Sequence, residues 1–215
     1  MNVLYSDEDI VVAEKPAGIG SQRTDKGEDM LTMLSAAGQG DCFPVHRLDT
    51  NTSGLIVYAK NKKAAAALSV QFAASVCGKS YYAVVCGTPE KDAATLENLL
   101  FHDRAKNKTY VVKRERKGVK KASLSYETLR TCRINGKEVS LLLVTLHTGR
   151  THQIRAQLGA AKHPLTGDGK YGAAGNLPFM LCCRELTFTH PSTGEKMTFT
   201  LECPFLNYLS ENADE

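Results

Sequence analysis

The sequence predicts an α+β fold in which a few helices flank a mixed, mostly antiparallel sheet. Short β-rich runs occur along the whole chain, and only a few segments show helical periodicity. The strands and helices do not alternate strictly, which is typical of α+β domains. A chain of 215 residues can bury a sizeable core. We therefore expect a single domain that covers residues 1–215.

The first half of the chain is predicted to contain both strands and helices. The β-rich runs predict strands at residues 10–15 and 55–59, and the periodic segments predict helices at residues 29–37 and 62–75. The second helix is rich in alanine and carries an apolar stripe at helical spacing, formed by Ala65, Leu68, Phe72 and Val76. We expect this stripe to pack on the sheet.

The second half of the chain is predicted to contain mainly strands. They are expected at residues 81–86, 109–113, 122–132, 139–147, 181–189 and 196–201. The dipeptide Asn135-Gly136 predicts a tight hairpin turn, so antiparallel pairing is expected in this half. A helix is expected at residues 151–161, with Thr151 capping its first turn.

Composition excludes several classes of protein. No stretch approaches the roughly 18 to 20 consecutive apolar residues that a membrane span needs. The acidic opening of the chain lacks the basic and apolar regions of a signal peptide. The seven cysteines are odd in number and form no Cys-x-x-Cys pair, so we expect reduced thiols and no metal site. A cytoplasmic protein is expected.

Positive charge is concentrated in residues 104–121. This segment holds nine basic residues against Glu115 alone, a local charge of +8, which leaves the remaining residues at −4 for a net charge of +4. A positive stripe on an otherwise acidic protein favours a polyanionic partner, because phosphate contacts supply most of the non-specific affinity for nucleic acid. The alternative is a solvated surface hairpin.

The tetrapeptide His46-Arg47-Leu48-Asp49 is the most informative motif. Turn-forming residues follow it at 50–54, and an apolar β-rich run comes next. Asp49 is therefore expected on a loop anchored by a strand, where rigid scaffolds usually present chemistry. Such a carboxylate is a candidate nucleophile or base, and the alternative is an ordinary turn or cap carboxylate.

This stretch resembles the signature of the RluA-like family of pseudouridine synthases, which is His-Arg-Leu-Asp, two variable residues, Thr-Ser-Gly and a hydrophobic strand. Further stretches agree with the family in the same order, at residues 9–18, 79–87, 149–155, 163–168 and 171–172. The resemblance implies an α+β catalytic domain that isomerises uridine in ribosomal or transfer RNA to pseudouridine. Many relatives carry an S4-type RNA-binding domain before it, and we expect none here because the chain starts at the first catalytic strand.

The resemblance implies roles for three catalytic residues. Asp49 matches the essential aspartate of the family, which needs neither a cofactor nor a metal. Its carboxylate serves as a nucleophile toward the sugar or base, or takes a 2′ proton, and the sequence leaves these open. Arg155 is implied to hold Asp49 ionised. Tyr81, chosen over Tyr82 by the register of Lys79, is implied to stack on the flipped uracil.

Other residues are expected to bind the RNA. Arg47 is implied to enter the space that the flipped uridine leaves, and His46 to shape the loop. Leu165 is expected to press against the uracil, or else to be ordinary core. The basic segment is predicted to form an RNA-gripping hairpin that includes Lys113, Arg114, Arg116 and Lys117.

Competing functions have weaker support in the sequence. Ser53, His46 and Asp49 provide the residue types of a hydrolase triad without its Gly-x-Ser-x-Gly elbow. His46, Asp49 and His152 have no recognised metal-ligand spacing. A non-catalytic RNA-binding or RNA-folding module is the remaining alternative. The expected partner is a structured RNA stem-loop, bound by a monomer without an obligate protein partner.

Overall fold

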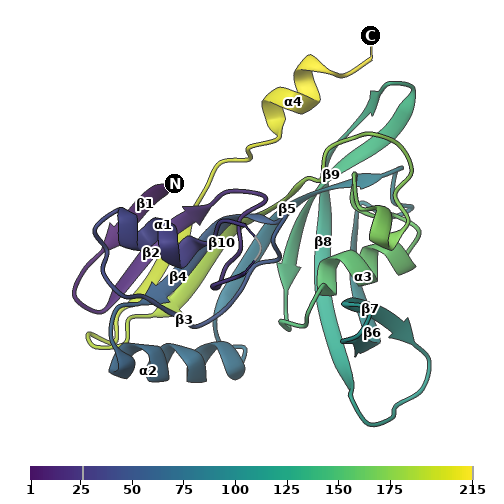
Figure 1. Ribbon diagram of the computed structural model, residues 1–215. Coiled ribbons are helices and arrows are strands. Elements are labelled where there is room, and N and C mark those ends of the chain that lie inside the picture. Colours follow the sequence, from purple (N-terminus) through teal and green to yellow (C-terminus); the bar gives the residue numbers. More distant parts are fainter. Residues whose placement is uncertain (26, 215) are drawn as a thin grey trace. The chain divides into compact units, whose positions relative to one another are not determined.

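In the computed structural model, which describes residues 1–25 and 27–214, the chain divides into two units. The first consists of Met1–Lys79 and Cys182–Glu202, and the second of Ser80–Leu181 and Cys203–Glu215. Each unit is thus assembled from segments far apart in the sequence, which Figure 1 shows by colour.

The first unit contains mixed β-structure. Its strands are β1 (Asn2–Ser6), β2 (Ile10–Lys15), β3 (Phe43–Pro44), β4 (Ser53–Ala59), β10 (Leu181–Thr189) and β11 (Lys196–Thr200). Strand β2 runs antiparallel to β1 and β4, and β11 runs antiparallel to β10, whereas β4 and β10 are parallel. The expected strands of this unit are confirmed, and the sequence pattern indicates neither β1 nor β3.

Both helices of the first unit begin after a side chain that caps them. The Asp29 carboxylate accepts a hydrogen bond from the Thr32 backbone N–H at 2.9 Å, and Asn61 accepts one from Ala64 at 2.9 Å. Such caps satisfy backbone N–H groups that have no partner within the helix. The helices are α1 (Met30–Ala36) and α2 (Lys62–Ala73).

Helix α2 is shorter than the sequence predicts. It buries Ala64 and Leu68 and contacts β3 and β4. The expected apolar stripe is wrong at Val76, whose side chain is 70% exposed. The reason is that the helix has already ended, because Ser75 adopts a φ of 57° and turns the chain away.

The second unit contains an antiparallel sheet in the order β5-β9-β8-β6-β7. Its strands are β5 (Gly78–Cys86), β6 (Ala93–Asp103), β7 (Lys108–Val112), β8 (Val119–Ile134) and β9 (Lys137–Leu146). The sequence pattern does not indicate β6, because this strand mixes polar and apolar residues with few β-branched ones. The strands expected at 109–113 and 122–132 both pair with β6 instead of with each other.

Helix α3 (Gln153–Ala160) begins later than predicted. The expected cap by Thr151 is wrong, because the residue before the helix is His152, which has a φ of 52° and makes no side-chain cap. Instead the Gln153 side-chain oxygen accepts hydrogen bonds from the Arg150 backbone N–H and from the Thr148 hydroxyl. The amide of Gln153 thus organises the turn that leads into the helix.

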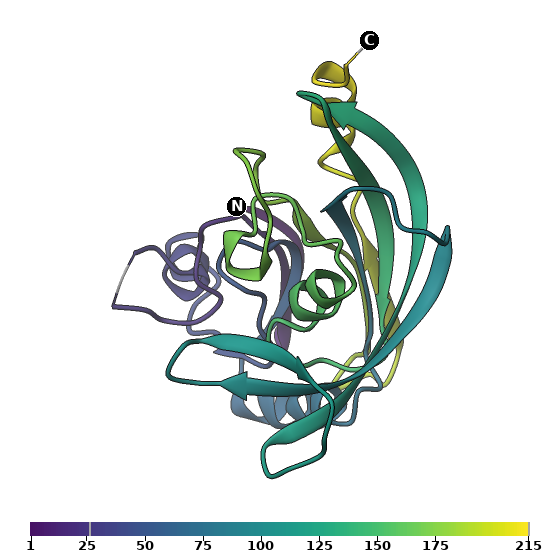
Figure 2. The ribbon, with the colours of Figure 1, turned by 90° about the vertical axis from the view of Figure 1, so that its right-hand side faces the viewer.

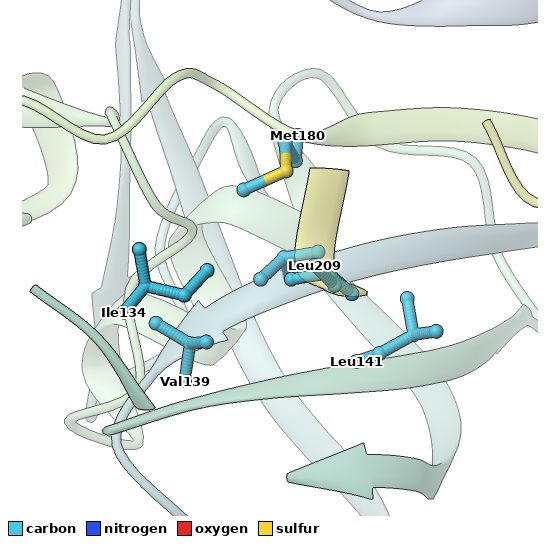
Figure 3. Packing of buried hydrophobic residues seen from close by; sticks show 6 residues of the cluster. Ile134, Val139, Leu141, Met180 and Leu209 are labelled. Carbon is cyan, nitrogen blue, oxygen red and sulfur yellow. The ribbon is translucent and has the colours of Figure 1, made fainter. Parts of the chain in front are cut away.

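One hydrophobic cluster of the second unit lies where the C-terminal helix α4 (Leu206–Glu211) meets the sheet. Figure 3 shows side chains of this cluster, which contains Val84, Ile134, Val139, Leu141, Met180 and Leu209. The hairpin turn at Asn135-Gly136 is confirmed, with positive φ at both residues. The carboxylate of Asp214 accepts hydrogen bonds from both turn N–H groups, at 2.9 and 2.7 Å. The chain end is thereby attached to the β8–β9 turn.

The seven cysteines of the chain are thiols without a disulfide. Over residues 1–25 and 27–214, no group of three or more His, Cys, Asp or Glu side chains could hold a metal ion. No helix in the described part of the chain is long and apolar enough to cross a membrane.

Gly54 lies where β4 and β10 come closest. Its φ of +105° disfavours any residue with a side chain. A Cβ at this position would lie 2.6 Å from the Cys183 backbone N and would also overlap its carbonyl oxygen. The parallel pairing of β4 with β10 therefore requires a glycine directly after the Asp49 loop.

Replacing Gly54 by alanine is expected to destabilise the protein. Backbone strain contributes about 1–3 kcal/mol, and the overlap with β10 adds about 1–3 kcal/mol. Urea unfolding measures the loss. Gly38→Ala is the matched control, because Gly38 also has a positive φ, +76°, but has open space around it. Equal losses in the two variants would contradict the close approach.

Candidate functional site

Asp49 lies in the loop between β3 and β4, and its flanking residues are fixed. The neighbouring Leu48 is buried, and its backbone N–H and carbonyl are both hydrogen-bonded to the Ser21 hydroxyl, at 3.1 and 2.8 Å. On the other side, the Thr52 N–H donates to the Asp49 carbonyl at 2.9 Å and closes a turn. Asp49 itself is half-buried, and Arg47 is exposed. The carboxylate is thus presented by a well-anchored turn, as the sequence predicts.

Lys15, the last residue of β2, ties this loop to the segment that follows β2. Its fully buried ammonium group donates hydrogen bonds to the carbonyls of Pro16, Ile19 and Thr50 at 2.8, 2.6 and 2.8 Å. Burial lowers the pKa of Lys15 to about 8, and the negative charge of Asp49 opposes this shift. Sequence reasoning missed Lys15, although a lysine that ends an apolar strand just before a proline was a signal for such a role.

His46 completes the hydrogen bonding of β4. Strand β3 ends at Pro44, and the Val57 N–H beyond that point donates to Nε2 of His46 at 3.1 Å. The imidazole also stacks on the Phe72 ring of α2 at 4.3 Å. Burial holds the pKa of His46 well below its usual value, and the nearby charge of Lys79 lowers it further. These contacts agree with a residue that shapes the loop.

Tyr81 and Tyr82 lie on opposite faces of β5, because neighbouring residues of a strand alternate. Tyr82 packs against the cluster of Figure 3. Tyr81 is 6% exposed and pairs with Val144 of β9. Tyr82 is thus partly buried on one face of β5 and Tyr81 is buried on the other, so the choice of Tyr81 for chemistry rests on its sequence motif.

Arg155 of α3 is held by an ion pair that the sequence motifs do not indicate. Its Nε and Nη2 donate to the two carboxylate oxygens of Asp168, at 2.7 and 2.9 Å. The Asp168 side chain is 2% exposed, so this two-point ion pair lies in the interior of the second unit. The Tyr171 and Phe179 rings lie 5.0 and 5.5 Å from the guanidinium carbon. The expected pairing of Arg155 with Asp49 stays a prediction.

Asp168 and Tyr171 belong to the same sequence stretch as Leu165. Leu165 is fully buried, and the residues on either side of it bond to β5, with Cys86 N–H donating to Pro164 and Thr166 N–H to the Val84 carbonyl. Within this unit Leu165 is core, which is one of the two roles expected for it. Its contact with uracil stays a prediction.

The basic segment 104–121 is not one hairpin, which corrects that expectation. It covers the β6–β7 turn, strand β7, the connection from β7 to β8 and the first residues of β8, and β7 and β8 lie on opposite sides of β6. Figure 2 shows the turn and the connection as teal loops. The four cations expected to grip RNA are all exposed in this connection: Lys113, Arg114, Arg116 and Lys117.

Comparison with known proteins identifies similar chains over most of this length. A family model described as RNA pseudouridylate synthase matches residues 9–160. A relative from Haemophilus influenzae, named dual-specificity RNA pseudouridine synthase RluA, is 34% identical and covers 95% of this chain and 94% of its own. A relative from Haemophilus ducreyi, named tRNA pseudouridine synthase C, is 32% identical over 93% of this chain and 90% of its own.

An uncharacterized RNA pseudouridine synthase from Aquifex aeolicus is 34% identical over 95% of this chain and 70% of its own length. Among solved structures, human RNA pseudouridylate synthase domain containing 1 aligns with a TM-score of 0.84 at 24% identity, covering 99% of this chain and 87% of that one. Human RNA pseudouridylate synthase domain containing 4 aligns with a TM-score of 0.78 at 22% identity, covering 97% of this chain and 92% of that one. These two structures confirm the α+β fold.

Replacing Lys15 by methionine is expected to loosen the Asp49 loop. The Thr50 carbonyl keeps its hydrogen bond from Gly18, but the carbonyls of Pro16 and Ile19 lose the Lys15 donor. A buried carbonyl left without a partner costs about 1–3 kcal/mol. Urea unfolding measures the free energy of unfolding of Lys15→Met. The control is Lys63→Met, because Lys63 is an exposed lysine on α2. The same unfolding free energy in both variants would show that the ammonium does not fix the loop.

Proposed function

Because the chain belongs to the RNA pseudouridylate synthase family, we propose that it isomerises uridine in ribosomal or transfer RNA to pseudouridine. Such enzymes are isomerases: the N1–C1′ bond of a uridine breaks, the base turns, a C5–C1′ bond forms, and the proton on C5 is replaced by one on N1. Nothing is added to or removed from the nucleotide, so the proposal includes no cofactor or metal ion. The names of the relatives from the two Haemophilus species support transfer RNA in one case and RNA of dual specificity in the other.

Asp49 is the proposed catalytic carboxylate. The observation that carries this assignment is the anchoring of its loop, by Ser21 at Leu48 and by the Lys15 ammonium at Thr50. A reactive group on a loop fixed at both flanks keeps its orientation while the substrate moves, which lowers the entropy cost of reaching the transition state. Asp49 then acts as a nucleophile toward the sugar or base, or takes the 2′ proton.

Tyr81 and Arg155 are proposed to act in the same reaction, as their sequence motifs imply. Tyr81 would stack on the flipped uracil and help to remove the C5 proton, and it lies on the face of β5 opposite Tyr82, which packs against the cluster of Figure 3. Arg155 would keep the Asp49 carboxylate ionised. The Asp168 ion pair supports the role of Arg155, because a guanidinium already fixed at two points loses little further entropy when it acts.

RNA binding is proposed for exposed residues in each of the two units. Arg47, exposed two positions before Asp49 in the chain, would occupy the space left by the flipped nucleotide. The exposed cations of the β7–β8 connection would bind phosphates. We also propose that residues 1–215 act as one catalytic domain and as a monomer, in the cytoplasm where these RNAs are found.

The test of the function is a pair of Asp49 variants. Asp49→Asn and Asp49→Ala are expected to abolish pseudouridine formation and to leave RNA affinity largely unchanged, because the side chain acts on sugar or base and not on phosphates. Pseudouridines are mapped in RNA from cells that lack this gene, after complementation with each variant.

Asp41→Asn is the control, since Asp41 is an exposed carboxylate in the same region of the chain, and it should restore every site that the parent restores. Turnover by Asp49→Asn would refute the catalytic role. A parent that restores no site but binds RNA would favour the non-catalytic RNA-binding module.

Removing the four exposed cations of the β7–β8 connection is expected to weaken RNA binding. With Lys113, Arg114, Arg116 and Lys117 replaced by Gln, the log–log dependence of affinity on salt should flatten by roughly 0.7 to 0.9 for each phosphate that the protein no longer neutralises. The rate on bound substrate should survive. Dissociation constants across a salt series give the slope.

The matched control removes the same number of exposed cations elsewhere, from Lys62, Lys63, Lys91 and Lys196. If both quadruple variants lower affinity and slope equally, general electrostatic attraction explains binding and the connection has no special role.

A further inference from the structure

Tyr171 contacts both helix α3 and strand β7 of the second unit. Its phenol oxygen accepts a hydrogen bond from the Thr109 backbone N–H at 2.8 Å and is hydrogen-bonded to Nδ1 of His152 at 2.9 Å. The guanidinium carbon of Arg155 lies 5.0 Å from the centre of its ring. A single side chain thus connects β7 to the guanidinium that we assign to catalysis.

The backbone of Tyr171 is held between α3 and Asp168. Tyr171 is the last residue of a short 3-10 helix, Gly169–Tyr171, and its N–H donates to the Asp168 carbonyl at 3.0 Å. Helix α3 approaches so closely that a Cβ on Gly159 would lie 3.0 Å from the Tyr171 carbonyl oxygen. The backbone of Tyr171 therefore cannot shift without disturbing either α3 or Asp168.

The Tyr171 ring restrains Arg155 in a direction that Asp168 does not. The two parallel hydrogen bonds to Asp168 fix the guanidinium within its plane. An aromatic face against that plane limits tilting, and it also attracts the cation electrostatically. The Phe179 ring lies farther from the guanidinium carbon, at 5.5 Å, so Tyr171 provides the closer of these two aromatic contacts.

Strand β7 is tied to the same region through Thr109. Besides the backbone bond to Tyr171, the Thr109 hydroxyl donates to the Thr151 carbonyl just before α3, at 2.7 Å. The neighbouring Lys108 places its ammonium 5.3 Å from the centre of the Tyr171 ring. The connection proposed to bind RNA begins directly after β7, at Lys113. A displacement of β7 would therefore reach Tyr171 through Thr109.

We propose that Tyr171 is a positioning residue, whose ring orients Arg155 and whose hydroxyl fixes β7, so that RNA binding at the basic connection and the orientation of Arg155 are coupled. The part that concerns reaction rate rests on the proposed function. The coupling itself is a property of the fold and can be measured without turnover.

The experiment separates ring from hydroxyl with two variants. Tyr171→Phe keeps the ring, so the single-turnover rate at saturating RNA should stay within about twofold of the parent, while the RNA dissociation constant rises about two- to tenfold for the missing hydrogen bond. Tyr171→Leu removes the ring and should lower that rate on the order of a hundredfold, as expected for a misplaced catalytic group. Tyr110→Leu is the control, because it removes an exposed ring of β7 that also lies near the Lys108 ammonium, at 5.6 Å.

A second measurement uses no activity. The Nε–H of Arg155, bonded to Asp168, gives an NMR signal that should shift when unmodified transfer RNA is added to the parent. The shift should be smaller in Tyr171→Phe, which lacks the hydroxyl bonded to β7, and absent in Tyr171→Leu, which also lacks the ring. Amide exchange at Thr109 should be faster in Tyr171→Phe than in the parent. If the parent forms no pseudouridine, the proposed function fails, and the shift still tests the coupling.

Several results would overturn the proposal. These are a parental rate in Tyr171→Leu, equal losses of rate in Tyr171→Phe and Tyr171→Leu, or an Arg155 signal that responds to RNA without the ring. If Tyr171→Leu does not fold, Tyr171→Met provides the ring-free variant with an adaptable side chain. If neither folds, unchanged Thr109 exchange together with unchanged RNA affinity in Tyr171→Phe refutes the coupling, and faster exchange with weaker affinity supports it.

Discussion

A buried ammonium group is the constraint on which the Asp49 loop depends. Lys15 is fully buried and satisfies carbonyls from both the segment after β2 and the loop itself. Burying a cation is expensive unless its hydrogen bonds are made and an opposite charge lies near. Here the three donors of the ammonium have three acceptors, and Asp49 supplies negative charge nearby. The carboxylate proposed for catalysis therefore also helps to stabilise the group that fixes its own loop.

The second unit also contains a largely buried cation, the guanidinium of Arg155. Arg155 is mostly buried and has a two-point ion pair with a carboxylate that is itself nearly inaccessible. Breaking such a pair by removing one partner leaves an uncompensated charge, which typically costs about 3–5 kcal/mol. In both units, charged groups that the sequence places in short motifs are held by partners distant from them in the chain, Thr50 for Lys15 and Asp168 for Arg155.

Elements of the fold that depend on the local sequence pattern could be predicted from the sequence. The strand after Asp49, the Asn135-Gly136 turn and the α+β class follow from β-rich runs and turn residues, and the structure confirms them. Features that depend on tertiary contacts were not predictable in this way. Strand β6 lacks a strong β pattern and exists because β7 and β8 pair with it. The N-terminus of α3 depends on the Gln153 side chain and not on the expected Thr151 cap.

The same distinction applies to the candidate site. The motif around Asp49 was readable because its neighbours in sequence are its neighbours in space. The roles of Asp168 and Tyr171 were not readable, since each depends on a partner whose distance in space the sequence does not give. Tyr171 is the clearest case, because its hydroxyl meets Thr109, 62 residues earlier in the chain.

The positive charge of residues 104–121 could protect an edge strand or could bind RNA. The positions of the cations show which explanation applies to each of them. Strand β7 ends the order of strands in the second unit, and exposed lysines on an edge strand discourage pairing with another chain. That explanation covers Lys108, the half-buried cation within β7. It does not cover Lys113, Arg114, Arg116 and Lys117, which lie beyond the end of the strand at Val112. A connection needs no protection against strand pairing, so its concentrated charge is better explained by a polyanionic partner such as RNA.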